Sequence, residues 1–396
     1  MVCLNRRGGT LKCAARLADA LAAHGPVRMI ISAHARGELL PENVELVRVP
    51  SGTSRTGNVL HTLSPASYHR VVSRVRRFQP TVVHVPVEHA WNMIVMPLLN
   101  RCPVVQTIHD PVRHVGLESR FYDFLRRMEL ARADRVIVLS DCFRQAFTAA
   151  GMPPERVDFV PHGQFAFGSG PWGQSFPEPP MSKRILFAGT IQRYKGVGVL
   201  LKAFPAVLEK HPDATLTIAG QGDLSPWAAL VREARNVTVI NRYITEEELA
   251  ALHAECDFVA VPYIDASQSG VVSTALANGR AVVATKVGGL AAQIADGTTG
   301  LLVEPGNVGQ LAGAMIDLLD NPERIGSLGR RARATYAEQF AWPRIAQRTM
   351  DVYAKAQATF RARQQSGRVP NLWQAVLQAI GARRLTGMPS RFRRRT

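Results

Sequence analysis

Short apolar runs separated by helical patterns extend along most of the chain. In the first half, apolar runs that predict strands cover residues 27–31, 44–49, 81–85, 104–108, 135–139 and 157–160. In the second half, similar runs cover residues 184–188, 215–219, 237–240 and 258–261. Because helical stretches separate many of these runs, the pattern predicts an α/β protein with parallel, doubly wound sheets.

The stretch 257–303 shows the clearest succession of elements. It predicts an apolar strand, a loop of small and hydrogen-bonding residues at 263–269, a helix that begins near Gly270, a strand, a Gly-Gly turn, a helix and a strand. A loop that leaves the carboxyl end of a strand and opens a helix presents free backbone N–H groups and the positive end of the helix dipole. This loop is therefore a predicted anion site.

Length and composition narrow the class of protein. At 396 residues, 46% of them hydrophobic and 20% charged, the chain is long enough for two globular domains. Five cysteines are scattered without CxxC spacing, which favours a reducing cytoplasm and argues against disulfides or a zinc site. No apolar run approaches the roughly 18 residues of a membrane span. We therefore expect a cytoplasmic protein that is at most peripheral to a membrane.

The formal charge of +17 is concentrated at the carboxyl end, where residues 361–396 contain arginines but no Asp or Glu. Since about half of the excess charge lies there, the charge does not indicate a nucleic-acid partner. Residues Trp373, Val376, Leu377 and Ile380 would form one apolar face of a helix ahead of the last arginines. Such a segment suits the surface of an anionic membrane, and a solvated, disordered terminus is the alternative.

Three turns contain candidate binding residues. Gly8 and Gly9 lie between a short strand and a helical pattern, where they would let a ligand approach the backbone or form a bare turn. His109 directly follows the predicted strand 104–108, a position typical of functional side chains, although a histidine there also caps loop backbone. Arg193 and Lys195 lie between two glycines of the loop 189–196, which suits either a diphosphate or a solvated basic loop.

Residues 164–182 are rich in Gly, Pro and Ser and show no periodicity, so they predict an interdomain linker. The expected organisation is an amino-terminal domain at 1–163, this linker, a carboxyl-terminal domain at 183–340, a helix at 341–358 and the tail at 359–396.

The order and spacing of several motifs resemble glycosyltransferase family 4. In the second half these are FAGTIQRYKGVGVLLKAF, LTIAGQGD, VTVINRY, VPYIDASQSGVV, ANGRAVVATKVGGL and GLLVEPGN, and in the first half RGGTLKCAARLADAL and TIHD. Members of this family are retaining GT-B enzymes that use nucleotide-sugar donors. The resemblance covers residues 1–358 and implies two Rossmann-like domains facing a cleft, with the acceptor on the first and the donor on the second. The helix 341–358 would cross back to the first domain.

The resemblance also implies roles for single residues. Lys195 matches the lysine that contacts the donor diphosphate, and His109 matches the histidine that faces the transferred sugar. Gly8 and Gly9 match the glycine pair near the donor phosphate.

Two further regions of the donor site follow from the same resemblance. The family's usual arginine after the first glycine of the loop is replaced by Thr190, and we expect Arg193 to substitute for it. Arg242 and Tyr243 fall where the nucleotide base is usually received.

The largest departure from the family concerns two glutamates that usually contact the sugar and the ribose. Ala266 and Thr274 stand at their positions, and an SQSGV sequence lies between them, which we associate with a subgroup of the family. Hydroxyl, carboxamide and backbone N–H groups can bond sugar or phosphate oxygens. The donor contacts of this loop are therefore expected at Gln268, Ser269, Gly270, Val271 and Thr274.

The expected activity is transfer of a hexose from a GDP- or UDP-type nucleotide sugar to a glycan or lipid-linked acceptor, in exopolysaccharide or cell-surface glycan assembly. Lys195, Arg193 and the helix start would stabilise the leaving nucleoside diphosphate, with His109 as a further catalytic residue. No metal-ligand cluster or paired carboxylates are apparent, so no metal or other cofactor is expected. Domain closure would exclude water. A catalytically silent GT-B partner or scaffold is the alternative, because both glutamates and the arginine are changed.

Overall fold

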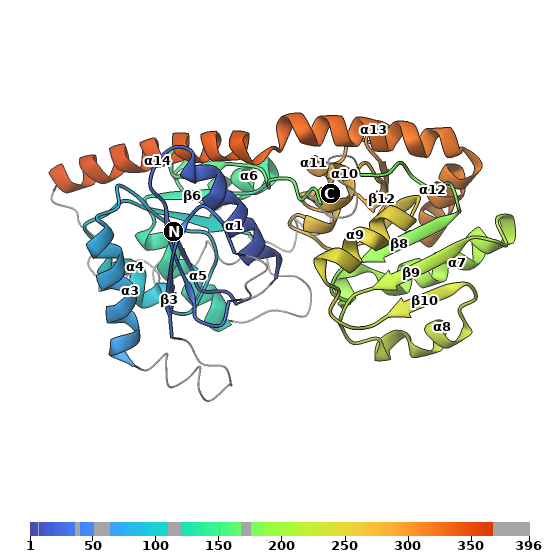
Figure 1. The fold of residues 1–396 in the computed structure, drawn as a ribbon, viewed down its shortest axis with the longest axis horizontal. Helices are drawn as coiled ribbons and strands as arrows, with labels where there is room; N and C mark the ends of the chain where they lie inside the picture. Colours follow the sequence, from blue (N-terminus) through green and yellow to red (C-terminus); the bar gives the residue numbers. More distant parts are fainter. Residues whose placement is uncertain are drawn as a thin grey trace. The chain divides into compact units, whose positions relative to one another are not determined.

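The computed structural model of the chain describes residues 1–6, 8–35, 40–50, 64–109, 120–149, 151–167 and 176–366 (Figure 1). The chain forms two units. Among the described residues, unit 1 contains those up to 163 and those from 342 onward, and unit 2 contains residues 164–341.

Unit 1 is built on parallel strands. They are β1 (Val2–Cys3), β2 (Arg28–Ser32), β3 (Glu45–Val49), β4 (Val83–Val85), β5 (Val104–Ile108), β6 (Arg135–Val138) and β7 (Val157–Phe159). The helices and one 3-10 turn are α1 (Gly9–Ala22), α3 (Pro65–Phe78), α4 (Asn92–Leu98), α5 (Arg120–Arg132), α6 (Asp141–Ala149), η2 (Pro154–Arg156) and α14 (Trp342–Gln365). The strands pair in the orders β1-β2-β3 and β4-β5-β6-β7, and β1 lies beside β4.

The central strands of unit 1 are buried on both faces, whereas Glu45 and Arg48 of the edge strand β3 are exposed. Val104 and Ile108 of β5 pack in one core with Val71 of α3, whereas Val105 packs in another core with Ile345 of α14. Because alternate residues of a strand point to opposite faces, a sheet covered by helices on both sides needs continuous apolar runs. This burial explains why the central strands of unit 1 were predictable from the sequence.

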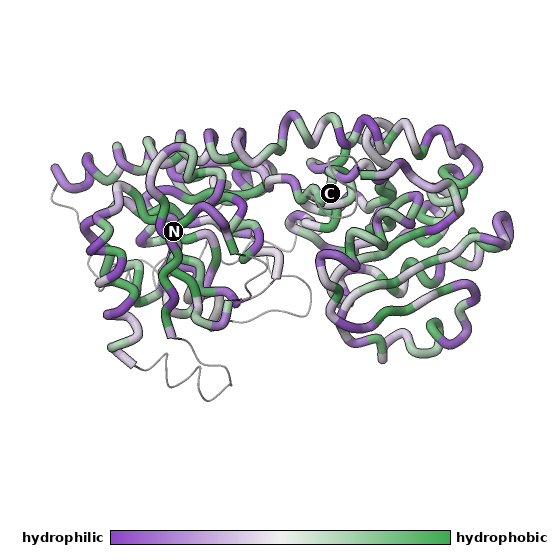
Figure 2. Tube along the Cα trace, viewed as in Figure 1, coloured by the Kyte–Doolittle hydropathy of each residue, from purple (hydrophilic) through white to green (hydrophobic). Residues whose placement is uncertain are grey.

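Unit 2 contains a six-stranded parallel sheet in the order β10-β9-β8-β11-β12-β13. Its strands are β8 (Arg184–Ala188), β9 (Thr215–Ala219), β10 (Val237–Ile240), β11 (Phe258–Val261), β12 (Ala281–Thr285) and β13 (Leu301–Val303). Its helices and 3-10 turns are η3 (Arg193–Lys195), α7 (Val197–Lys210), η4 (Ser225–Trp227), α8 (Ala228–Glu233), α9 (Glu246–Glu255), α10 (Gly270–Ala277), α11 (Leu290–Gln293), α12 (Val308–Asp320) and α13 (Pro322–Gln339). The central strands are mainly hydrophobic (Figure 2).

The predicted fold class is confirmed, because both units have parallel sheets flanked by helices. The predicted helix start at Gly270 is also confirmed. In unit 2 the order of strands reverses between β8 and β11, which makes the carboxyl ends of these two strands the topological switch point.

The described parts of the expected linker pack on unit 2. The side chain of Asn278 donates a hydrogen bond to the carbonyl oxygen of Phe165 (3.1 Å). The fully buried guanidinium of Arg280 donates to the carbonyl oxygens of Pro177 (2.8 Å) and His253 (2.5 Å). These bonds tie the segment at Phe165 and at Pro177 to residues that directly follow helix α10.

Helix α14 continues beyond its expected end at residue 358. Arg363 pairs with the buried Asp134 at 2.6 Å. The expected basic tail had included this arginine. Lys355 pairs with the buried Asp158 at 2.7 Å. The carboxyl-terminal part of α14 is therefore anchored to the body of unit 1 by charge pairs.

The expected amphipathic segment of the tail lies in residues 367–396, outside the described residues. Within the ranges that the structure describes, no helix combines the length and apolar character needed to cross a bilayer.

Candidate active site

The loops after β8, β9 and β11 pack closely at the switch point of unit 2. Gly196 has φ 70°, and a Cβ atom there would overlap the carbonyl oxygen of Pro262. Gly220 has φ 150°, and a Cβ atom there would overlap the carbonyl oxygen of Gly189. The N–H of Ile264 also donates to the carbonyl oxygen of Tyr194, at 2.7 Å. Glycines are required where these backbones meet, and the contacts hold the loops in one arrangement.

Lys195 lies at this junction, and its side chain is buried, with 9% relative exposure. A Cβ atom built on Gly189 would lie 3.1 Å from the lysine Nζ and 3.2 Å from a methyl group of Val271. The Nζ atom is 5.2 Å from the centroid of the Tyr263 ring. None of the ion pairs between described residues involves Lys195. The ammonium group thus lies beside the start of α10 with no carboxylate partner in the part of the chain described.

Arg193 and Thr190 are on the exposed side of the same loop. Arg193 opens the 3-10 turn η3 that leads to Lys195. Hydrogen bonds from Ser225, together with the charge of Arg193, lower the pKa of the Asp223 carboxyl. The charge of Arg193 therefore interacts with the Asp223 carboxyl, but Arg193 is far more exposed than Lys195.

The start of helix α10 is fixed by side chains. The hydroxyl of Ser269 accepts a hydrogen bond from the N–H of Val272 at 3.3 Å, as an N-cap. The carboxamide of Gln293 accepts from the N–H of Ser269 (2.8 Å) and donates to its carbonyl oxygen (3.1 Å). Ser269 is thus held in place by structural bonds. The N–H groups of Gly270 and Val271 are at the helix start, where no intrahelical acceptor exists.

Two buried polar atoms of the preceding loop have no partner among the described residues. They are the Oε1 atom of Gln268 and the hydroxyl of Tyr263. The sequence pointed to Gln268 as a candidate, whereas Tyr263 was seen only as the first residue of the loop. The contact of its ring with Lys195 arises from the packing of two loops, so no local sequence pattern could have predicted it.

The positions of the family's two glutamates are occupied by buried residues. Ala266 is 4% exposed and Thr274 is 7% exposed. The carbonyl oxygen of Thr274 accepts a hydrogen bond from the side chain of Asn278 at 2.6 Å. A methyl group and a hydroxyl therefore stand in place of carboxylates at these two positions.

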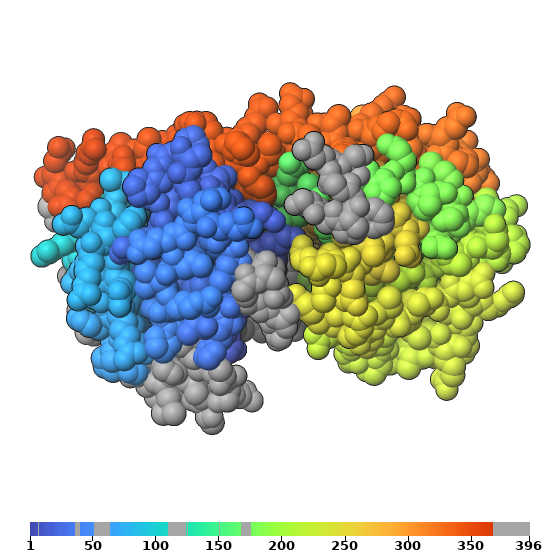
Figure 3. Space-filling model, in the orientation of Figure 1, coloured from blue at the N-terminus to red at the C-terminus, as the bar shows by residue number. Residues whose placement is uncertain are grey.

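Arg242 and Tyr243 follow β10. Figure 3 shows in yellow part of the unit 2 surface formed by this region of the sequence. The guanidinium of Arg242 makes two hydrogen bonds to the carboxylate of Glu248, at 2.8 and 2.6 Å. These bonds lower the pKa of Glu248 to about 2. Glu248 also completes a capping box with Thr245 at the start of α9. The guanidinium is thus engaged by Glu248, whereas the ring of Tyr243 is exposed.

In unit 1, Gly8 and Gly9 lie at the start of α1. Gly8 has φ 90° and occupies the N-cap position, with no side-chain cap. A Cβ atom on either glycine would meet no atom of the described residues within 4 Å. The first turn of α1 is therefore open to a ligand, and it contains no acidic residue.

His109 directly follows β5 in unit 1. Its Nε2 atom lies 3.0 Å from the carbonyl oxygen of Pro86. Because a carbonyl oxygen only accepts, Nε2 bears the proton in this bond. The ring stands edge-on to that of His162, with centroids 6.4 Å apart. Burial lowers the pKa of His162 to about 4, so this neighbour is neutral at physiological pH.

A buried carboxyl near the end of β4 was not anticipated. Glu129 of α5 accepts a hydrogen bond from the N–H of His89 at 3.2 Å. Beside it, Arg126 and Glu88 form an ion pair at 2.6 Å. Burial, and then the charge of Glu88, raise the pKa of Glu129 to about 8.

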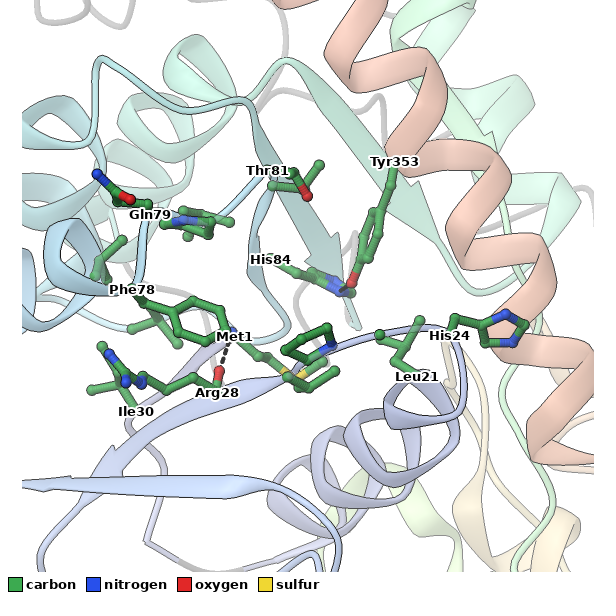
Figure 4. A pocket seen from close by; sticks show the side chains of 18 of the residues that line it. Met1, Leu21, His24, Arg28, Ile30, Phe78, Gln79, Thr81, His84 and Tyr353 are labelled. Atoms are coloured by element: carbon green, nitrogen blue, oxygen red, sulfur yellow. Dashed lines mark hydrogen bonds between the residues drawn. The ribbon is translucent and has the colours of Figure 1, made fainter.

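A cavity of about 450 Å³ lies at the opposite edge of the unit 1 sheets, near the amino ends of β2 and β4 (Figure 4). Met1, Phe78 and Gln79 line it. His84 and Tyr353 point toward each other, and the ring Nδ1 and the hydroxyl are 2.8 Å apart. None of the expected site residues lines this cavity. In the described ranges, no three His, Cys, Asp or Glu residues form a group able to hold a metal ion.

Family models match both halves of the chain. The glycosyl transferase 4-like domain matches residues 8–163, and the domain described as glycosyl transferases group 1 matches residues 182–321. The D-inositol 3-phosphate glycosyltransferase of Pseudarthrobacter chlorophenolicus is 32% identical over 314 residues, covering 72% of this chain and 74% of that protein. The enzyme of the same name from Corynebacterium aurimucosum is 36% identical over 188 residues, covering 45% of this chain and 44% of that protein. The latter match thus spans less than half the length of that relative.

A solved structure has the same fold. The crystal structure of Anabaena HepE in complex with UDP and glucose matches with a TM-score of 0.67 and 18% identity, over 89% of this chain and 98% of that one. The two parallel-sheet units therefore have the GT-B fold. The chain belongs to the glycosyltransferases with group 1 and 4-like domains, which confirms the family resemblance.

Proposed function

We propose that the protein is a retaining glycosyltransferase that moves a sugar from a nucleotide-diphosphate sugar to a glycan or lipid-linked acceptor. The proposal rests chiefly on Lys195. Its buried ammonium lies at the switch point of unit 2, beside the start of α10, without a carboxylate partner in the described ranges. A buried cation at a helix start suits a diphosphate, because an anion there satisfies both the charge and the free N–H groups.

In this proposal the donor diphosphate is bound by Lys195 and by the N–H groups of Gly270 and Val271. These groups stabilise the negative charge that grows on the leaving nucleoside diphosphate. Arg193 adds a more exposed positive charge. Gln268 offers a hydroxyl of the donor a buried carbonyl oxygen that has no hydrogen-bond partner among the described residues.

The base is proposed to stack on the exposed ring of Tyr243, since the guanidinium of Arg242 is engaged by Glu248. HepE was solved with UDP and glucose, which supports a UDP-type donor, and GDP is the alternative.

The acceptor is assigned to unit 1. Gly8 and Gly9, at the first turn of α1, stay proposed contacts of the donor phosphate. His109 is held by Pro86, with Nδ1 directed away from that bond. We propose that His109 acts at the transferred sugar. Retention of configuration would follow if the acceptor hydroxyl attacked the face from which the diphosphate departs, with positioning in place of a carboxylate nucleophile. The proposed biological role is assembly of exopolysaccharide or of cell-surface glycans.

The alternative is a catalytically silent GT-B partner protein. It is favoured by one observation, the replacement of both family glutamates by the buried Ala266 and Thr274. A silent protein would neither hydrolyse nor transfer sugar from any nucleotide sugar.

A thermal-shift screen of UDP and GDP sugars, followed by hydrolysis and transfer assays with each stabilising donor, tests the proposal. We expect Lys195→Ala to lower turnover at least about tenfold, as for the loss of one group that stabilises the leaving charge. Lys202→Ala, on the exposed side of α7, is the matched control and is expected to behave as the wild type. Near-normal turnover of Lys195→Ala would refute the assigned role of Lys195.

Association with the inner face of the plasma membrane is proposed for the tail from its arginines and apolar positions. Because Arg363 belongs to the folded part of α14, the informative truncation ends at Ser366. Co-sedimentation with anionic liposomes should be lost in the truncated protein, and equal binding by both forms would exclude the tail.

A further inference from the structure

We infer that Tyr263 is a positioning residue whose ring holds the Lys195 ammonium where the donor diphosphate binds. The inference deepens the proposed function and rests on it for the identity of the anion. The geometry on which it stands is independent of any ligand.

The ring of Tyr263 is fixed in the fold. The residue follows β11 and is 2% exposed. Its carbonyl oxygen accepts a hydrogen bond from the Thr285 hydroxyl at 2.5 Å. Its ring meets the Tyr194 ring edge-to-face, with centroids 6.2 Å apart. The backbone of Tyr263 is therefore fixed by the end of β12, and its ring packs against the loop after β8.

The Lys195 side chain is confined by the same surroundings. Its backbone N–H closes the 3-10 turn on Gln192 at 3.0 Å, and the next residue, Gly196, has the positive φ that reverses the chain. The Nζ atom lies 5.2 Å from the Tyr263 centroid, and a Cβ atom on Gly189 would approach it to 3.1 Å. The ammonium group thus has the Tyr263 ring as a neighbour and packs against Gly189, where any side chain would crowd it.

An aromatic ring suits this task better than a carboxylate. The face of the ring attracts a cation through its quadrupole, but it has no negative charge to neutralise the lysine. A carboxylate at the same place would pair with Lys195 and compete with the phosphate oxygens. The lysine can therefore be held in place while its charge remains available to an anionic ligand.

The ring, and not the hydroxyl, is assigned this role. Among the described residues, the buried Tyr263 hydroxyl has no hydrogen-bond partner. Replacement by phenylalanine would keep the ring and remove an unpaired polar group. Replacement by leucine would remove the ring.

Tyr263 also packs in the core of unit 2. A purely structural role therefore has to be separated from positioning. The two roles differ in one respect: positioning acts only through Lys195, whereas a loosened core affects the site whether or not the lysine is present.

The test uses the full chain with Tyr263→Phe and Tyr263→Leu, each alone and combined with Lys195→Ala. The first measurement is the rate of acetylation of Lys195 by acetic anhydride, read by peptide mass spectrometry against the exposed Lys202. The second is the affinity for UDP and for GDP by calorimetry. Should Tyr263→Leu fail to fold, as judged by its melting curve, Tyr263→Met replaces it as a flexible non-aromatic side chain.

We expect Tyr263→Leu to raise the acetylation rate of Lys195 at least about fivefold, with the Lys202 rate unchanged, because the ammonium loses its cation–π contact. Tyr263→Phe should stay within about twofold of the wild type. Nucleotide affinity should fall about five- to thirtyfold in Tyr263→Leu when Lys195 is present, and no more than about twofold in the Lys195→Ala background.

Unchanged acetylation of Lys195 in Tyr263→Leu, or equal loss of nucleotide affinity in both backgrounds, would overturn the inference. Equal acceleration of acetylation in Tyr263→Phe would overturn the assignment to the ring. If acetylation changes as expected but Lys195→Ala itself leaves nucleotide affinity intact, positioning of the lysine stands and the proposed diphosphate contact fails.

Discussion

The substitution Glu129→Gln is expected to stabilise unit 1 at alkaline pH. Glu129 is 1% exposed, accepts a hydrogen bond from the N–H of His89, and lies near the ion pair of Glu88 with Arg126. Burial and the Glu88 charge raise its pKa to about 8, from an ordinary value of 4.5. The folded protein thus keeps this carboxyl protonated at neutral pH.

The sign and size of the effect follow from proton linkage. Between pH 4.5 and about 8 the unfolded chain releases the proton of Glu129 and the folded chain retains it. Folding stability from this group is therefore complete below pH 4.5 and is lost as the pH rises to about 8. At about 1.4 kcal/mol for each pKa unit, the loss across this range is roughly 5 kcal/mol. Glutamine keeps an acceptor oxygen for His89 and has no proton to release.

Urea unfolding at pH 5, 6.5 and 8 tests this reasoning. The other titrating groups are common to both proteins, so the difference in unfolding free energy isolates Glu129. It should shift in favour of Glu129→Gln by several kcal/mol between pH 5 and pH 8. The exposed Glu42→Gln is the control in the same unit and should show no such trend. A difference that is constant with pH would refute the protonated state of Glu129.

Three further outcomes are expected. Burial lowers the pKa of His84 to about 3 and of His162 to about 4. Unit 1 should therefore lose stability as the pH falls from 6.5 toward 4, because the unfolded chain binds these protons first. Melting curves of His84→Gln should show a smaller loss over the same pH range. Arg280→Met leaves three buried carbonyl oxygens without their donor, and its urea midpoint should reveal a loss of about 3 kcal/mol in unit 2. Ser269→Ala should cost about 1 kcal/mol by loss of the N-cap, and Ser269→Asn should restore most of it in the same unfolding assay.

The sequence predicted the strands and the helix starts well because those signals are local. The central strands are buried on both faces, so they are continuous apolar runs. The helix start at Gly270 follows a serine N-cap, and the start of α9 follows the Thr245–Glu248 capping box. The end of α14 was placed too early, because its terminal arginine Arg363 is stabilised by Asp134, which is distant in the sequence.

The contacts of the candidate site that join two distant segments could not be predicted from the sequence. Lys195 is in a motif, but its contact with Tyr263 depends on how the loops after β8 and β11 pack. Arg242 was assigned to the base from its position alone, and the bidentate bond to Glu248 appears only in three dimensions. Glu129 carried no signal at all, because its pKa depends on burial beneath a loop from another part of unit 1.

Titration of UDP and GDP into the wild type, Lys195→Ala and Lys202→Ala by calorimetry tests the central claim most directly. The account predicts that one of the two nucleotides binds the wild type and Lys202→Ala equally, and binds Lys195→Ala at least about tenfold more weakly, since a charged diphosphate contact is lost. Equal affinity in all three proteins, or no binding of either nucleotide to the wild type, would contradict a donor site at the switch point of unit 2.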